Sequence, residues 1–533
     1  MAEDPIDVLI IGAGASGAAV AWSLAETRMR IVCLEQGEWM NPAEYPSTGR
    51  DWEARSLNDF NYSPNRRNRV TDYPINDSNS PISLANFNGV GGSTILYAGH
   101  YPRFHPSDFR VRTLDGVADD WPIDYKTLAP YYAQNDLMTG VSGLAGDPAY
   151  PNKELILPPL PLGKSGETLA RGFNKLGWHW WPSDSSVASD VYDGRNKCIN
   201  LGACASGCAQ GAKGSADITY WPHAMRNRVE VWPRCRVAQI TVNSKGMASG
   251  VLYYDADGTQ HEQKAAIVVL ACNGVGTPRL LLNSTSNQFP DGLANSSGLV
   301  GKNFMCHPYT AIYGVFDEPM DTYKGPHNCI WSHEFYETDL SRGFVRGFIY
   351  ESVRGYSSVG TGIIGSKLGK ISWGKNHHTE YRRLFNRMTF LQSICEDLPE
   401  ESNTVTLDPK LKDTNAIPAP KLDYVISENT QKMMNFAIAR ATEVLEAAGA
   451  QDVFSRSPLS EGGWHLLGTA RMGIDPSSSV VNEWGRSHDV KNLFIVDGSI
   501  FVTSAGVNPT CTIQALSLYI ADSIKKRLSN LFD

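Results

Sequence analysis

The first 35 residues constrain the fold more than any other segment of the chain. Gly12, Gly14 and Gly17 stand at the spacing G-x-G-x-x-G, between an apolar run at 8–11 and small residues at 18–24. The first glycine permits a tight turn, the second lets a pyrophosphate approach the backbone, and the third lets a helix pack closely on the strand. This order of strand, turn and helix predicts a Rossmann-like unit that binds a dinucleotide.

Two further features of this unit favour a bound dinucleotide over a glycine-rich turn without a ligand. Ala15 and Ser16 lie at the predicted helix N-terminus, where backbone amides and the helix dipole attract phosphate. A second apolar run ends at Glu35, eighteen positions after Gly17, where a carboxylate accepts hydrogen bonds from the adenosine ribose. The unit alone does not distinguish FAD from NAD, because both contain the ADP half.

Length and composition indicate a globular protein of two or three lobes. The chain has 533 residues, 42% of them hydrophobic and 20% charged. Its net charge of −8 and the lack of a long basic run argue against nucleic acid as a partner. No apolar run reaches the roughly 18 residues of a membrane-spanning helix. The acidic start leads directly into a strand, which predicts a cytoplasmic protein and leaves export alongside a partner subunit open.

The order of the predicted elements indicates an α/β fold with an inserted second lobe. The apolar run at 265–272 is typical of a strand in a parallel sheet, whereas patches at 310–316 and 403–409 suggest an antiparallel sheet elsewhere. Amphipathic helices are expected at 165–175 and 429–448. The predicted dinucleotide-binding domain comprises 1–115, 198–305 and 465–533, and the second domain, with a surface excursion, comprises 116–197 and 306–464.

Several motifs together resemble the glucose–methanol–choline (GMC) family of FAD-dependent oxidoreductases. They are the N-terminal glycine turn, GVGGST at 89–94, ACNGVGTPRLLL at 271–282, HLLGTARMG at 465–473, and VDGS followed by NPT. The resemblance covers essentially the whole chain and implies an FAD-binding domain plus an inserted substrate domain with a mainly antiparallel sheet. The segment at 198–222, CINLGACASGCAQGAKGSADITYWP, narrows it to the branch of pyranose-oxidase-like enzymes, glycoside oxidases and sugar dehydrogenase large subunits.

The resemblance also implies which residues surround the FAD. These are Gly91, Gly92, Ser93 and Thr94 along the flavin ring, Val237 facing the adenine, Asp497 and Gly498 at the pyrophosphate and ribityl chain, and Asn508, Pro509 and Thr510 near the pyrimidine edge. Some relatives link the flavin to a histidine just after the glycine turn. Leu96 stands near that position here, and His100 and His105 are displaced from it, so we expect non-covalent FAD.

The same motifs imply the chemistry. Alcohol oxidation by a flavin moves a hydride from carbon while a base removes the hydroxyl proton, and a neutral histidine suits that role. His465 matches the family's catalytic histidine, and Asn508 matches the residue that orients the substrate oxygen. We expect oxidation of a secondary alcohol of a sugar, glycoside or related polyol to the ketone. Dioxygen, a quinone or a redox protein would accept the electrons, and the oligomeric state stays open.

Cys198, Cys204 and Cys208 form a close cysteine cluster in a glycine-rich loop. Three thiolates at such spacing are compatible with an iron–sulfur cluster, which would make the chain the catalytic subunit of an electron-transferring dehydrogenase with partner subunits. A loop without metal is favoured, because related oxidases share much of the segment. A zinc site and a disulfide are the further alternatives.

Other residues have a structural interpretation beside the functional one. We expect core packing rather than sugar stacking for Trp178, Trp180 and Trp181, a solvated loop rather than a metal pair for His377 and His378, and contact with the cleft for Gln392 and Glu396. Two competing functions are a flavin-dependent lyase on the same fold and a flavin-binding protein without catalysis.

Overall fold

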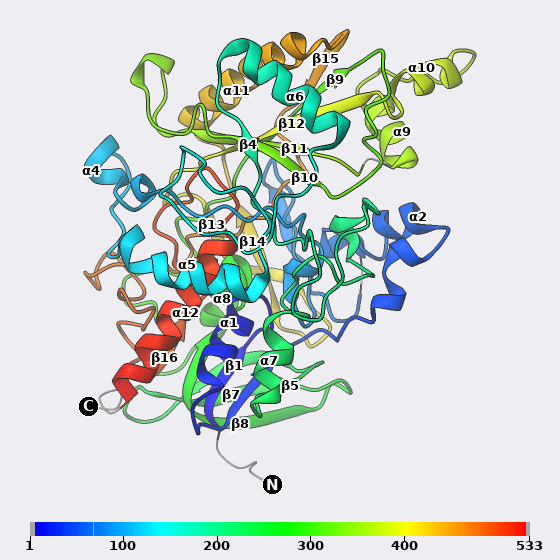
Figure 1. The fold of residues 1–533 in the computed structure, drawn as a ribbon. Coiled ribbons are helices and arrows are strands. Elements are labelled where there is room, and N and C mark those ends of the chain that lie inside the picture. Colours follow the sequence, from blue (N-terminus) through cyan, green and yellow to red (C-terminus); the bar gives the residue numbers. More distant parts are fainter. Residues whose placement is uncertain (1–5, 68, 356, 529–533) are drawn as a thin grey trace.

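A computed structural model describes residues 6–67, 69–355 and 357–528. Its first layer is a seven-stranded sheet near the lower end of the molecule in Figure 1. Five strands pair in parallel, in the order β5 (Glu230–Trp232), β2 (Ile31–Leu34), β1 (Ile6–Ile11), β8 (Gln260–Leu270) and β16 (Leu493–Ile495). The first half of β8 pairs antiparallel with β7 (Ala248–Tyr254), which pairs with β6 (Arg236–Val242).

Glycines at the first turn allow the turn to pack closely on the end of β8 and on the following helix, α1 (Ala15–Leu24). Gly12 has a φ of +102°, and a Cβ there would lie 2.5 Å from the Ala271 carbonyl oxygen. A Cβ on Gly17 would lie 2.0 Å from the carbonyl oxygen of Gly12. Neither position tolerates a side chain without backbone movement, so both glycines serve packing.

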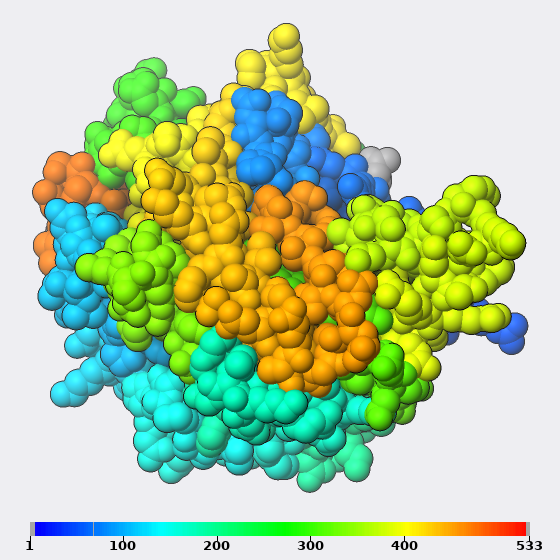
Figure 2. Space-filling model, turned by 90° about the horizontal axis from the view of Figure 1, so that it is seen from above, coloured from blue at the N-terminus to red at the C-terminus, as the bar shows by residue number. Residues whose placement is uncertain are grey.

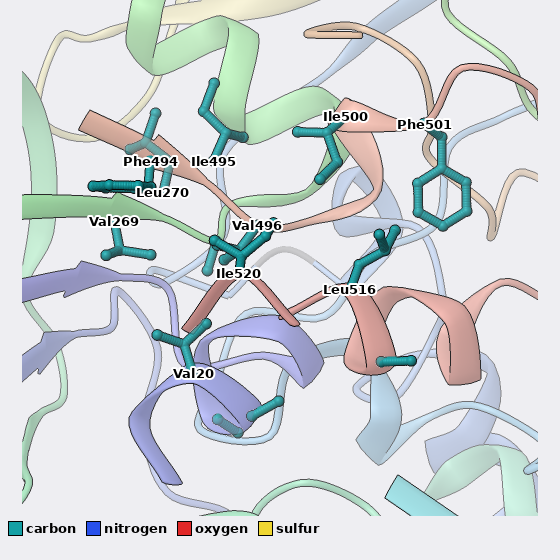
Figure 3. Close-up of a cluster of buried hydrophobic side chains, with 14 of the residues drawn as sticks. Val20, Val269, Leu270, Phe494, Ile495, Val496, Ile500, Phe501, Leu516 and Ile520 are labelled. Atoms are coloured by element: carbon teal, nitrogen blue, oxygen red, sulfur yellow. The ribbon is translucent and has the colours of Figure 1, made fainter. Parts of the chain in front are cut away.

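The C-terminal segment packs directly on this N-terminal unit. β16 pairs with β8, and helix α12 (Thr510–Arg527) packs against α1 and against α5 (Tyr125–Thr139). Figure 3 shows the buried aliphatic cluster that joins them, with Val20 from α1, Val269 from β8, Ile495 from β16 and Ile520 from α12. This buried cluster holds the N-terminal and C-terminal segments of the chain together in one domain.

A six-stranded antiparallel sheet forms the second lobe, at the upper end of Figure 1. Its strands lie in the order β15 (Asp452–Arg456), β9 (Tyr309–Val315), β12 (Met388–Cys395), β11 (Phe348–Val353), β10 (Asn328–Ser332) and β4 (Trp181–Pro182). Helices α6 (Gly163–Leu176) and α11 (Glu428–Ala448) lie over it, close to the predicted ranges. The Rossmann-like parallel sheet and the antiparallel sheet confirm the predicted fold class, whereas the domain limits stay a prediction.

The side-chain alternation of a strand separates the two faces of this sheet. Ile312, Leu391 and Tyr350 point to one face and pack with Phe173 of α6 and Met433 of α11. The residues that alternate with them point to the other face and border the cavity described below. One face therefore anchors the sheet, and the opposite face is available for a site.

The strand expected at 403–409 belongs to a different sheet from the one that its patch suggested. β13 (Thr404–Lys412) pairs with β14 (Pro418–Asp423), which pairs with β3 (Asn76–Asn79) in a separate three-stranded sheet. Which strands pair depends on tertiary contacts, and the local residue pattern does not specify it.

The remaining helices lie around these sheets. They are α2 (Trp52–Leu57), α3 (Pro64–Arg67), α4 (Val111–Asp115), α7 (Tyr220–Arg226), α8 (Asn273–Asn283), α9 (Ser358–Lys367) and α10 (His377–Leu384). In the view from above, the α9–α10 segment projects at the right of the molecule (Figure 2). His377 and His378 begin α10 at the surface, so the expected solvated site is helical and not a loop. Among the described residues, no helix is long and apolar enough to cross a membrane.

Replacement of Ile520 tests whether the packing of α12 on the N-terminal unit stabilises the fold. The side chain is fully buried, so Ile520→Ala should lower the free energy of unfolding by about 2–5 kcal/mol through lost contacts and a cavity. Urea unfolding followed by tryptophan fluorescence measures this. Ile474, which is 77% exposed, provides the control, because Ile474→Ala should change stability by no more than about 0.5 kcal/mol. Equal effects of the two variants would contradict the role of the cluster.

Candidate active site

A cavity of about 640 Å³ lies between the parallel sheet and the free face of the antiparallel sheet. The glycine turn, the start of α12 and the segment around His465 form its lower side. The upper side is the sheet face formed by Tyr309, Ala311 and Tyr313 of β9, Phe390 and Gln392 of β12, and Glu351 and Val353 of β11. The cavity thus lies between the two lobes, where ligand sites are common.

Most residues predicted to surround the FAD line this one cavity. They are Gly12, Gly14, Ala15, Ser16, Glu35, Gly92, Ser93, Thr94, Val237, Asp497, Gly498, Asn508, Pro509 and Thr510. Gly17 and Gly91 stand behind the lining and serve packing. Gly91 has a φ of +100°, and its amide donates to the Ala13 carbonyl at 2.9 Å, which joins the two glycine turns.

The two turns meet so closely that a Cβ does not fit at Gly92, although one fits at Gly14. A Cβ on Gly92 would lie 2.7 Å from the Gly14 Cα, whereas a Cβ on Gly14 would have only the Gly92 Cα near it, at 3.9 Å, and would project into the cavity. A side chain at Gly14 would fill space beside the N-terminus of α1, where a pyrophosphate is favoured. The turn therefore fits the phosphates of a dinucleotide.

Two buried carboxyl groups, those of Glu35 and Asp497, line the cavity. Glu35 accepts hydrogen bonds from the backbone amides of Ala13 and Gly37, both at 2.8 Å. Asp497 accepts from the Thr277 hydroxyl at 2.6 Å and from the amide of Ser499 at 2.8 Å. Burial raises the pKa of both carboxyls, against the lowering effect of these hydrogen bonds. Each carboxyl has lone pairs left for a ligand hydroxyl.

A single antiparallel bridge brings two histidines together. Met305 and Leu467 exchange backbone hydrogen bonds of 3.0 and 3.1 Å. In that register, position 307 opposes position 465. The Nδ1 atoms of His307 and His465 are 2.6 Å apart, and the Tyr309 hydroxyl lies 3.3 Å from both ring nitrogens of His465.

The hydrogen bonds of His307 determine which nitrogen of His465 accepts a proton. The His307 Nε2 atom faces the carbonyl oxygens of Ser504 and Ala505, at 3.2 and 2.6 Å, and must donate to them. Burial lowers the pKa of His307 to about 4, so its ring is neutral and its Nδ1 accepts from His465 Nδ1. Burial, and next the nearby His307, also lower the pKa of His465, which leaves a lone pair on His465 Nε2.

Sequence reasoning missed His307, Tyr309 and Glu351, which lie near His465 and Asn508 only through strand register. Of the two residues expected at the cleft, Gln392 lines the cavity from β12. Glu396 does not, because its carboxylate pairs with the buried Arg346 guanidinium at 2.9 Å outside the cavity.

The histidines after the glycine turn have different environments. Leu96 and His100 line the cavity, whereas His105 is buried away from it and stacks on Tyr336. Trp178 and Trp180 pack against the core of the second lobe and Trp181 against the main core, so the expected packing role of these tryptophans is confirmed.

The three clustered cysteines are free thiols that surround a small cavity of about 20 Å³. That volume suits about one water molecule and does not fit an iron–sulfur cluster. Within the described ranges, no group of three or more His, Cys, Asp or Glu side chains is arranged to hold a metal ion. Lys213 fastens this loop to the second glycine turn, because its Nζ donates to the carbonyls of Ile95, Tyr97 and Cys204 at 2.6–2.8 Å.

The fold and the cavity define a class of enzyme in which a dinucleotide lies across a parallel sheet beneath a second, antiparallel lobe. Comparisons with known proteins agree with that class. Family models described as GMC oxidoreductase match residues 6–309 and 399–517. The chain therefore belongs to the GMC oxidoreductase family, is an oxidoreductase acting on alcohol groups, and has FAD as the cofactor that this membership supports.

Individual relatives cover nearly the whole chain. It is 42% identical to 2-methyl-1,2-propanediol dehydrogenase of Mycolicibacterium austroafricanum, over 99% of this chain and 97% of that protein. It is 30% identical to 6'''-hydroxyparomomycin C oxidase of Streptomyces lividus, over 98% and 92%, and 28% identical to the fructose dehydrogenase large subunit of Gluconobacter japonicus, over 97% of each chain. Among solved structures, pyridoxine 4-oxidase from Mesorbium loti has the same fold, with a TM-score of 0.67, 17% identity, and 98% and 99% of the chains covered.

Substitution of two neighbouring glycines separates the dinucleotide site from the fold. Gly14 has a φ of −76°, which any residue adopts, so Gly14→Ala should leave the melting temperature of the FAD-free protein unchanged and weaken FAD binding by about tenfold or more. Gly17→Ala should instead destabilise the FAD-free protein by about 1–3 kcal/mol through its backbone clash. Thermal unfolding and titration with FAD give both quantities. Full FAD affinity in Gly14→Ala would contradict the assignment of the turn.

Proposed function

We propose that the protein oxidises an alcohol of a sugar, glycoside or related polyol, with non-covalently held FAD and with His465 as the base. The observation that carries the proposal is the pair of histidines, because His307 leaves the Nε2 atom of His465 as a proton acceptor in a cavity that also suits a dinucleotide. A secondary hydroxyl is the expected position of attack.

The chain's own residues would hold FAD along the cavity. Glu35 would accept the ribose hydroxyls, the first glycine turn would bind the pyrophosphate, and the segment from Asn508 to Thr510 would lie beside the ring system. Leu96 offers no atom for a bond to the flavin, which supports non-covalent binding. When bound, FAD supplies the acceptor for a hydride, which carries the two electrons of the oxidation.

The protein's part in the reaction is to take a proton and hold the substrate oxygen. His465 Nε2 would remove the hydroxyl proton, while His307 holds the ring in the required tautomer. Asn508 would orient the same oxygen, and holding the reacting groups in place lowers the barrier by removing motional freedom beforehand. The buried, neutral imidazole is ready to accept the proton without first losing one.

Relatives support the substrate class without narrowing it to one compound. Their names specify a diol, fructose and an aminoglycoside, all of which carry several hydroxyl groups. Dioxygen, a quinone or a redox protein would accept the electrons. The geometry around Cys198, Cys204 and Cys208 does not support the alternative of an electron-transferring subunit with an iron–sulfur cluster.

An anaerobic screen tests this function. Mixing the FAD-loaded protein with sugars, glycosides, polyols and simple alcohols should bleach the visible flavin absorbance for at least one class. His465→Ala should keep FAD bound and slow the bleaching by about 100- to 10,000-fold, because the base is lost. Product formation without bleaching would indicate a lyase. Unchanged bleaching in His465→Ala would refute the assigned base.

The acid side of the pH profile tests the protonation state of His465. A pKa held well below 6.5 by burial keeps the ring neutral, and the base is lost only when the pH falls below that lowered pKa. We expect kcat/KM for anaerobic flavin reduction to stay constant between about pH 7.5 and pH 6.5 and to fall only in more acidic solution. A tenfold loss per pH unit that begins at or above pH 6.5 would contradict a buried, neutral base.

A further inference from the structure

The cavity is lined by a group of buried polar atoms that lack partners. Within the described part of the chain, Glu351 Oε1, Asn508 Oδ1 and both ring nitrogens of His100 have no hydrogen bond. Glu351 is fully buried, and His100 is 3% exposed. All three residues line the cavity. Buried polar groups are nearly always paired, so such a group indicates that a ligand supplies the partners.

Glu351 is the centre of this group. It lies on β11 directly opposite Gln392 of β12, and Gln392 Nε2 donates to Glu351 Oε2 at 2.9 Å. The side chain of Asn508 also interacts with this carboxyl group and lowers its pKa. Glu351 Oε1 lies 3.3 Å from His100 Nδ1, but the two are not aligned for a hydrogen bond. Oε2 of Glu351 therefore has a hydrogen-bond partner, whereas Oε1 has none.

The charge state of this group suits a neutral ligand. Burial raises the pKa of Glu351 to about 8, so the group is a carboxylic acid at neutral pH. Burial also lowers the pKa of His100 to about 3, which keeps its ring neutral. A protonated carboxyl and a neutral imidazole each offer a donor and an acceptor, as does a hydroxyl group. An ionic ligand would find no opposite charge on these two residues.

We propose that Glu351, with Gln392 and His100, binds a second hydroxyl group of the substrate, next to the one that reacts at His465 and Asn508. Asn508 ties the two positions together, because it would hold the reacting oxygen and also contacts Glu351. Neighbouring hydroxyls of a 1,2-diol are separated by about one hydrogen-bond length, which matches two adjacent partners. The site therefore selects 1,2-diols and larger polyols with that unit. This inference rests on the proposed function.

The first experiment compares binding without any reaction. 2,3-Dimethylbutane-2,3-diol is a 1,2-diol whose two carbinol carbons carry no hydrogen, so it binds without being oxidised. Its one-hydroxyl counterpart is 2,3-dimethylbutan-2-ol, a tertiary alcohol with the same carbon skeleton. Perturbation of the flavin absorbance in the FAD-loaded protein gives both dissociation constants. We expect the diol to bind at least about tenfold more tightly, the loss for one hydrogen-bonded hydroxyl. Equal affinity would overturn the second-hydroxyl site, whether or not the protein oxidises alcohols.

The second experiment uses substitutions at Glu351 and compares two oxidisable substrates. In anaerobic stopped-flow reduction, Glu351→Leu should lower kcat/KM for propane-1,2-diol by about 10- to 1,000-fold and that for propan-2-ol by less than about threefold. Glu351→Gln should recover part of the diol rate, since an amide still donates and accepts. Glu262→Gln, at an exposed position on β8, is the matched control for a Glu-to-Gln replacement away from the cavity.

The outcomes distinguish the site from the function. Equal losses on both substrates would mean that Glu351 only orients Asn508. No loss on either substrate would mean that Glu351 neither binds a substrate hydroxyl nor orients Asn508. Each result overturns the proposal. Failure of every alcohol to reduce the wild-type flavin would refute the proposed function instead. Should the variants not fold, the binding preference of the wild-type protein for the unreactive diol still decides.

Discussion

The burial of the last strand and helix against the first βαβ unit is the interaction on which the site depends. β16 extends the parallel sheet beside β8, and α12 covers α1 through the aliphatic cluster of Figure 3. Asn508 stands just before α12, so this packing delivers it to the glycine turn almost 500 residues earlier in the chain. Full burial of each large aliphatic side chain contributes about 1.5–3 kcal/mol, enough in sum to hold the two ends together.

The histidine pair shows how a backbone contact controls side-chain chemistry. The bridge between Met305 and Leu467 places His307 opposite His465, and the carbonyls of Ser504 and Ala505 then orient the His307 ring. Ala505 has a φ of +57°, a conformation that costs free energy for a residue with a Cβ. The fold accepts this strain at a position where a carbonyl must face His307. The tautomer and the orientation of His465 thus follow from this one backbone contact.

The two faces of the antiparallel sheet have different roles. Helices α6 and α11 cover one face, and the contact is made by apolar side chains. The other carries Glu351 and Gln392 among aromatic residues and borders the cavity. A strand that alternates apolar anchors with cavity-facing residues can therefore change its ligand contacts with little effect on its packing.

The sequence by itself determined the features that are local. The glycine spacing predicted the turn and α1. Continuous motifs singled out His465, Asn508 and the predicted cofactor-binding residues, most of which line the cavity. The tertiary structure alone decided features that depend on which strands pair. It placed β13 in a separate sheet, moved Glu396 away from the cavity to Arg346, and brought His307, Tyr309 and Glu351 to the site. The conformation of a glycine turn depends on a few consecutive residues. Strand register depends on burial and hydrogen bonding between segments far apart in the chain.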